Sequence, residues 1–106
     1  MPNFAETLQQ LPGVEHIEKL ELCDNNNVVG VIENKPGQAG SLAVYHRIAT
    51  PLEHIDATAA QQGLVLYAEH TADAKANPGK HPNIDRLLDL IAAQKTLTIR
   101  AIPKSA

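Results

Sequence analysis

The apolar residues between Asn83 and Lys95 constrain the fold more than any other feature of the sequence. Asn83 precedes them as an N-cap, and Lys95 follows them with a charge that suits the helix dipole. Their spacing fits one face of an amphipathic helix without a miss. The members of this face are Ile84, Leu87, Leu88, Ile91 and Ala92. We therefore predict a helix here, and its apolar face must be buried against another layer.

Strand-like segments at both ends of the chain can supply that layer. Residues 17–24 (IEKLELCD) alternate apolar and polar side chains, and residues 28–34 (VVGVIEN) are rich in β-branched residues. The Asp and Asn residues between them favour a turn, so the two segments predict an antiparallel hairpin. Residues 96–102 (TLTIRAI) alternate in the same way. They predict a last strand, which we expect to pair with the hairpin.

Two shorter segments also predict helices. Asn3 and Glu6 form a capping box that opens the first, which ends before Pro12. Ser41 caps the second, in which apolar residues recur at helical spacing as far as Pro51. A strand is the alternative for this second segment. We favour the helix, because Leu52 and Ile55 extend the same spacing beyond the proline.

The long segment from Asp56 to Pro78 predicts a helix of about five turns, capped by Asp56. The alternative has a C-cap at Gly63 and a short buried strand at residues 64–67, since a glycine inside a helix costs about 1 kcal/mol. We favour the continuous helix. Taken together, the segments predict an α+β fold for residues 1–106 as a single domain. A small antiparallel sheet of about three strands, the N-terminal hairpin plus the C-terminal strand, packs against three or four helices.

Composition excludes several classes of function. The 106 residues carry a net charge of −3 without a run of like charge, which argues against a nucleic-acid partner. No segment is long and apolar enough to suggest a membrane span. The single cysteine, Cys23, fits a reducing compartment, so we expect a cytoplasmic protein. We expect no cofactor.

A polar cluster is the first candidate site. Its members are Tyr45, His46, Tyr67, Glu69, His70 and Asp73. Imidazole and carboxylate groups bind divalent metals, which makes His46, His70, Asp73 and His81 the candidate ligands, although no H-x-x-x-H spacing supports them. A pair such as His70 with Asp73 or Glu69 could alternatively serve acid–base catalysis, with a tyrosine as proton donor.

The second candidate site is the loop that enters the helix after Pro82. Free amides and the helix dipole favour an anion there. Lys80, His81, Asn83 and Arg86 are the candidate anion-binding residues.

Several motifs also resemble a known family. They are Glu33–Gly37, Ala39–Leu42, Val44–His46, Leu66–Thr71 and His81–Leu87. Nearly the whole chain is similar to a family of short bacterial proteins with a domain of unknown function. The resemblance implies bacterial origin and one stand-alone domain, and it leaves the function open. Residues 34–37 followed by Leu42 also resemble the ligand corner of ACT domains, but that fold needs a strand soon after the helix.

Two classes of function remain open. We favour a non-enzymatic binding or interaction module, because the chain has no catalytic signature beyond the polar cluster. Its partner would be a protein or a small molecule, and a homo-oligomer is one form such an interaction can take. The alternative is a small metal-binding protein or enzyme that uses the cluster of histidines and carboxylates on the central helix.

Overall fold

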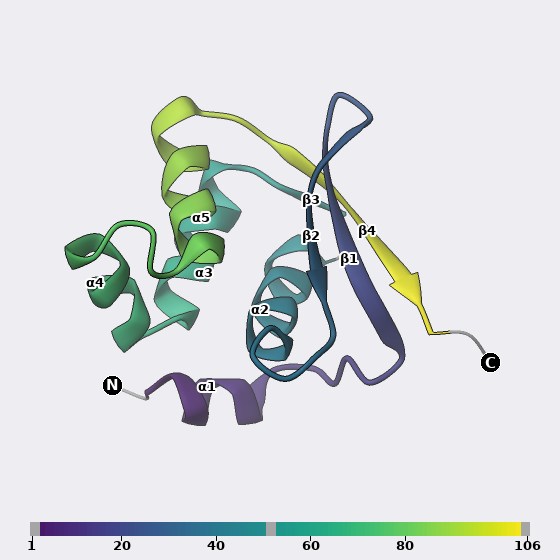
Figure 1. Ribbon diagram of the computed structural model, residues 1–106, viewed down its shortest axis with the longest axis horizontal. Coiled ribbons are helices and arrows are strands. Elements are labelled where there is room, and N and C mark those ends of the chain that lie inside the picture. The colour runs from purple at the N-terminus through teal and green to yellow at the C-terminus, as the bar shows by residue number, and fades with distance from the viewer. Residues whose placement is uncertain (1–2, 51–52, 105–106) are drawn as a thin grey trace.

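The computed structural model describes residues 3–50 and 53–104. It has an α+β fold, as predicted, with five helices and four strands in the described residues, one strand and at least one helix more than expected (Figure 1). The elements are α1 (Phe4–Gln10), β1 (Ile17–Asp24), β2 (Asn27–Glu33), α2 (Ala39–Ala49), β3 (His54–Ile55), α3 (Ala57–Leu66), α4 (Glu69–Ala76), α5 (Pro82–Ala93) and β4 (Leu97–Pro103).

The four strands form one antiparallel sheet in the order β2-β1-β4-β3. The hairpin and the pairing of β4 with it are confirmed: Leu20 of β1 lies between Ile32 of β2 and Ala101 of β4. The sequence did not predict β3, because two residues are too few to form a pattern. The strand exists through its contact with β4, where the carbonyl of Glu53 accepts the N–H of Ile99 at 2.8 Å.

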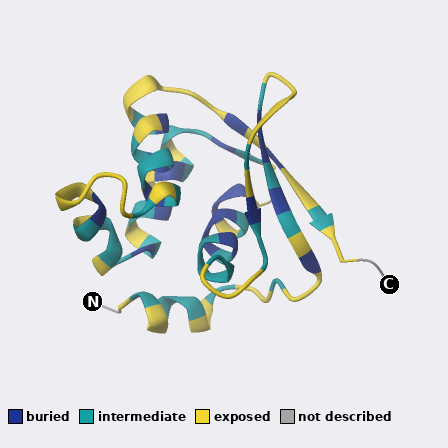
Figure 2. Ribbon diagram, viewed as in Figure 1, coloured by how far each residue is buried: buried dark blue, intermediate teal, exposed yellow. Residues whose placement is uncertain are grey.

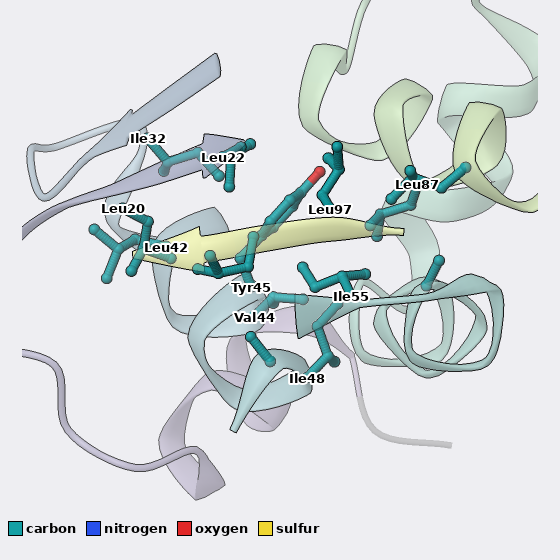
Figure 3. Packing of buried hydrophobic residues seen from close by; sticks show 14 of the residues in the cluster. Leu20, Leu22, Ile32, Leu42, Val44, Tyr45, Ile48, Ile55, Leu87 and Leu97 are labelled. Carbon is teal, nitrogen blue, oxygen red and sulfur yellow. The ribbon is translucent and has the colours of Figure 1, made fainter. Parts of the chain in front are cut away.

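All five helices lie on one side of the sheet in Figure 1. The inner face of the sheet is buried beneath them, while exposed side chains alternate along β4 (Figure 2). Leu, Ile and Val fill most of the core, together with Tyr45, which is fully buried (Figure 3). The largest fully buried side chains also include Ile17, Leu20, Leu22, Ile32, Leu42, Ile55, Ile84 and Leu87.

Helix α2 confirms the prediction of a helix before Pro51 but corrects its start. It begins at Ala39, so Ser41 lies in its first turn and is not the N-cap. It ends at Ala49, and Leu52 falls outside the described residues. Ile55 belongs to β3 and does not extend the helical spacing. An ACT domain needs a strand soon after this helix. In this chain the next strand, β3, has only two residues, so the resemblance to the ACT corner ends there.

The prediction of one continuous helix of five turns is wrong, because this segment forms two helices, α3 and α4. The N-cap at Asp56 is confirmed: its side chain accepts the N–H of Ala59 at 2.8 Å. Ala68 interrupts the helix with φ 55° and ψ −122°, a conformation that normally belongs to glycine. Thr71 Oγ1 donates to the carbonyl of Leu64, so α4 satisfies one of the last carbonyls of α3.

Gly63 is neither a C-cap nor next to a strand, because it lies inside α3 and is buried. A Cβ on Gly63 would lie 2.7 Å from Cδ1 of Leu87 and 3.0 Å from Cδ1 of Ile48. The glycine therefore lets α3 approach both α5 and α2 closely. The cost of a glycine within a helix is offset by this packing.

Helix α5 confirms the strongest sequence pattern, with a corrected start. Pro82 is its first residue, which makes His81 the N-cap and puts Asn83 inside the first turn. Proline suits this first position because it needs no hydrogen-bond acceptor there. The helix ends at Ala93, and its C-cap Gln94 has φ 54°. Lys95 Nζ then lies 3.9 Å from Asp24 Oδ2. Within the described ranges, no helix has the length and apolar character needed to cross a membrane.

Candidate functional site

A surface pocket of about 410 Å³ lies where α1, the first turns of α2 and α5, and the junction of α3 and α4 meet. Figure 1 shows α1 running below α2, with its N-terminal end toward that junction. We call this hollow the His81 pocket. It is lined by Phe4, Leu8, Gly37, Gly40, Ser41, Tyr67, His70, Lys80, His81, Pro82, Asn83 and Ile84.

Two helix N-termini open onto the His81 pocket. Gly37, with φ 90°, completes the turn that leads into α2, and Pro82 starts α5. The first backbone N–H groups of a helix have no acceptor within the helix. Accordingly, no described residue accepts the N–H groups of Gly40, Ser41 or Asn83. Gly40, Ser41 and Asn83 line the pocket, so the residues that carry these amides and the positive ends of two helix dipoles lie beside it.

An aromatic wall closes the side formed by α1. The ring of Phe4 stacks on Tyr67 with centroids 5.5 Å apart, and meets His70 edge-on at 5.0 Å. Phe4 also fills the space beside Gly40, where a Cβ would lie 3.2 Å from its ring. Its backbone N–H donates to Glu69 Oε1 at 2.8 Å. The backbone amide of Glu69 itself, and then that of Phe4, lower the pKa of the Glu69 carboxyl by hydrogen bonding to it.

Asp73 accepts hydrogen bonds from three side chains beside the pocket. Its Oδ2 lies 2.6 Å from His81 Nε2 and 3.0 Å from Lys80 Nζ, and its Oδ1 accepts from Asn77 Nδ2 at 2.9 Å. The hydrogen bonds from His81 and Lys80 hold the pKa of Asp73 at about 2. Asp73 therefore stays ionised, and it fixes the imidazole of His81, whose side chain is 24% exposed. The His70 ring lies beside it, with centroids 5.5 Å apart.

The two tyrosines are hydrogen-bond donors. Tyr67 donates from its hydroxyl to Ser41 Oγ at 2.7 Å, which leaves the Ser41 hydroxyl hydrogen free to donate. Tyr45 donates to the backbone carbonyl of Asn83. Burial raises the pKa of both, that of Tyr45 to about 12, so both stay protonated. Arg86 packs on the ring of Tyr45 at 5.8 Å and donates to Asn83 Oδ1 at 2.8 Å.

The structure brings only part of the two predicted sites together. Of the predicted residues, Tyr67, His70, Lys80, His81 and Asn83 line the His81 pocket. Glu69 and Asp73 are bonded to residues that line it. Tyr45 and Arg86 are not among the lining residues. Tyr45 bonds to Asn83 from the core, and the half-buried Arg86 bonds to Asn83 within α5.

His46 does not join this cluster. It follows Tyr45 on α2, and adjacent residues point about 100° apart around a helix. Since Tyr45 faces α5, the ring of His46 lies elsewhere, 6.4 Å from that of His16. Burial and the nearby His16 lower the pKa of His46, and its Nδ1 has no hydrogen-bond partner among the described residues.

The proposed metal ligands do not form a centre in the part of the chain that is described. There, no three His, Cys, Asp or Glu side chains lie close enough to hold a metal ion. His81 and Asp73 bond directly to each other, and His46 lies apart.

Sequence reasoning missed Phe4, Ser41 and Asn77 as parts of the site. The capping box at Asn3 and Glu6 signals where α1 starts, and so where Phe4 lies, but not which helix Phe4 contacts. Ser41 was assigned to a cap. Nothing in the sequence links Asn77 to Asp73 except their spacing of four residues within one helical segment.

The model of one protein family, described as an uncharacterized protein conserved in bacteria (DUF2322), matches residues 4–101. The chain belongs to this family. The DUF2322 match confirms the resemblance noted in the sequence, and it includes every residue that lines the His81 pocket. No curated protein and no solved structure proved similar to this DUF2322 chain.

Proposed function

We propose that this protein is a non-enzymatic binding module that holds a small anion-bearing molecule in the His81 pocket. One observation carries the proposal: three residues at two helix N-termini, whose backbone N–H groups have no described acceptor, line the same hollow as Lys80. Donors of this kind bind phosphate and carboxylate groups in many proteins. We expect the protein to act in the bacterial cytoplasm, because its one cysteine fits a reducing compartment.

Size and chemistry support a small organic anion as the ligand. A volume of about 410 Å³ lies within the range of small-molecule sites, roughly 300–1,000 Å³. The rings of Phe4 and Tyr67 offer an apolar surface for the uncharged part of such a ligand. The Ser41 hydroxyl and the imidazole of His70 add polar groups on the same wall.

Asp73 reduces the positive charge of the pocket but leaves room for an anion. A lysine ammonium has three hydrogens, so Lys80 can donate to Asp73 and to a ligand at once. Among the described residues, no backbone acceptor takes the amides of Gly40, Ser41 and Asn83. We therefore expect affinity to depend on both the amides and Lys80.

A titration with inorganic phosphate and then acetate, followed by proton–nitrogen NMR, tests the proposal. We expect saturable shifts of the Gly40, Ser41 and Asn83 amides, weakened by Lys80→Ala. Lys75→Ala is the matched control, because Lys75 is also an exposed lysine of this region and does not line the pocket. Shifts that never saturate, or that Lys75→Ala weakens equally, would contradict the proposal.

A second candidate function is acid–base catalysis, which the bond between His81 and Asp73 favours. A carboxylate bonded to Nε2 of an imidazole orients the ring and leaves Nδ1 as the proton acceptor. Long-range proton–nitrogen spectra of the histidine rings test this arrangement. We expect neutral His81 to carry its hydrogen on Nε2, and a hydrogen on Nδ1 would rule the catalytic role out.

A further inference from the structure

The charges beside the His81 pocket cancel while its imidazoles are neutral. Of the described residues that line the pocket, only Lys80 carries a permanent charge. Its Nζ lies 3.0 Å from Oδ2 of Asp73, whose pKa is about 2, so this carboxylate is ionised at neutral pH. The pair is neutral as a whole. An anion that enters the pocket therefore meets little net positive charge from these two side chains.

His70 is the lining residue that can add a positive charge without a carboxylate bonded to it. Its half-buried ring meets Phe4 edge-on at 5.0 Å and lies 5.5 Å from the ring of His81. Among the described residues, no group bonds to either of its ring nitrogens, and neither nitrogen is sealed from solvent. His81 differs, because its Nε2 is already bonded to Asp73 at 2.6 Å.

The other charged side chains of the helices around His70 are bonded to partners of their own, and none of them lines the pocket. They are Glu6, Glu69, Asp85 and Arg86, whose respective partners are Asn3, Phe4, Gly79 and Asn83. The charges of Glu69 and a protonated His70 attract each other. From α2, only the uncharged Gly40 and Ser41 line the pocket. The charge that an anion meets there is therefore set by Lys80, His70 and His81.

We propose that the His81 pocket takes up its anion together with one proton, and that His70 is the residue that binds this proton. The inference rests on the function proposed above. The proton comes from the solvent, and it gives the pocket the net positive charge that Lys80 alone does not supply. Protonated His70 also has two N–H donors, neither of which is committed to a described residue.

Linkage fixes how such a pocket responds to pH. If a bound anion favours the protonated ring, the proton must strengthen anion binding by the same factor. Affinity should therefore rise as the pH falls through the range in which imidazoles titrate, roughly pH 8 to 5. Asp73 stays ionised over this range. The ligand class is thus an acid that is held as an anion beside a protonated histidine and is released as the pH rises.

Titration with sulfate at about pH 5.5 and about pH 8, followed by proton–nitrogen NMR of the pocket amides, tests the proposal. Sulfate is the probe because its own charge does not change between these pH values. We expect the wild-type protein to bind sulfate about tenfold more tightly at the lower pH, and His70→Gln to lose most of this difference. His54→Gln is the matched control, because it also removes one histidine, and His54 lies in β3 outside the pocket.

The outcomes separate this inference from the binding function itself. Sulfate that binds equally at both pH values, or a pH dependence that persists in His70→Gln, overturns the role of His70 and leaves the binding function standing. A pH dependence that His54→Gln removes equally also overturns it. If sulfate binds at neither pH, the binding function fails as well.

The His70 ring of the wild-type protein gives a second measurement without any substitution. Long-range proton–nitrogen spectra follow the protonation of each histidine ring as the pH changes. Saturating sulfate should move the titration midpoint of His70 to higher pH, and by more than that of His54. An unchanged midpoint for His70 would show that its proton is not coupled to the anion.

Discussion

The imidazole of His81 and the carboxylate of Asp73 face each other at 2.6 Å, across the loop that separates α4 from α5. Helical spacing had instead suggested His70 as the partner of Asp73. Because Lys80 and Asn77 bond to the same carboxylate, Asp73 also ties the loop to α4. The charge of Asp73 therefore contributes to stability as well as to the pocket.

Acid should destabilise the protein partly through Asp73. Its pKa is lowered from 3.8 to about 2 on folding, so the unfolded chain binds this proton more readily than the folded chain. The stabilisation is complete above about pH 4 and is lost as the pH falls toward 2. Asp73→Asn should flatten this part of the curve of unfolding free energy against pH. Asp89→Asn is the control for an exposed carboxylate, and an equal effect there would contradict the assignment.

Tyr67→Ala should destabilise the fold by about 3 kcal/mol, since the ring is 3% exposed and stacks on Phe4. Tyr67→Phe should cost about 1 kcal/mol, because it removes only the hydrogen bond to Ser41. Urea unfolding measures both. Val65→Ala is the control, because Val65 is exposed. If the urea midpoint of Tyr67→Ala lay as close to that of the wild type as the midpoint of Val65→Ala does, Tyr67 would not be a core residue.

Ala68→Gly should stabilise the protein by about 1 kcal/mol. An L-residue with positive φ is strained, and glycine adopts this conformation without a Cβ clash. Ala72→Gly, an exposed position within α4, should instead destabilise by about 1 kcal/mol. Thermal unfolding of the two variants should therefore move in opposite directions, and a loss of stability in both would show that Ala68 is not strained.

Gly63→Ala should destabilise the protein by about 1 kcal/mol, although alanine is the better helix former. The new methyl group would lie 2.7 Å from Leu87, which is fully buried and cannot move aside freely. Overpacking of this kind costs about 1–3 kcal/mol, which exceeds the helix-propensity gain of about 1 kcal/mol. Gln62→Ala, on the exposed side of α3, should change the urea midpoint little. A gain of stability in Gly63→Ala would show that the helices can separate at no cost.

Much of the fold follows from local patterns. The hairpin, β4 and α5 were predicted because their apolar periodicity and turn residues act over a few neighbours in sequence. The break at Ala68 was not, because alanine gives no local signal for a positive φ, and the partners of the neighbouring Tyr67, Phe4 and Ser41, lie far away in the chain. Strand β3 was missed because two residues form no pattern, and its partner β4 begins some forty residues later.

The candidate site was predicted less completely than the fold. The sequence pointed to His70, Lys80 and His81 because residues of this chemistry are concentrated between α3 and α5. It could not show that α2 brings Gly40 and Ser41 to the same place, because that depends on how helices pack. Nor could it separate His46 from the others, which follows from the direction in which Tyr45 enters the core.

Helix α1 has no buried residue, and its attachment to the rest of the protein relies on the half-buried Phe4 and Leu8 and on one hydrogen bond from the Phe4 amide. A segment with so little buried surface opens at a much lower free energy than the core. The wall that α1 contributes to the pocket can thus swing away while the sheet and the other helices remain folded. The rate at which a ligand enters and leaves would then depend on the local opening of the seven residues of α1, and not on global unfolding.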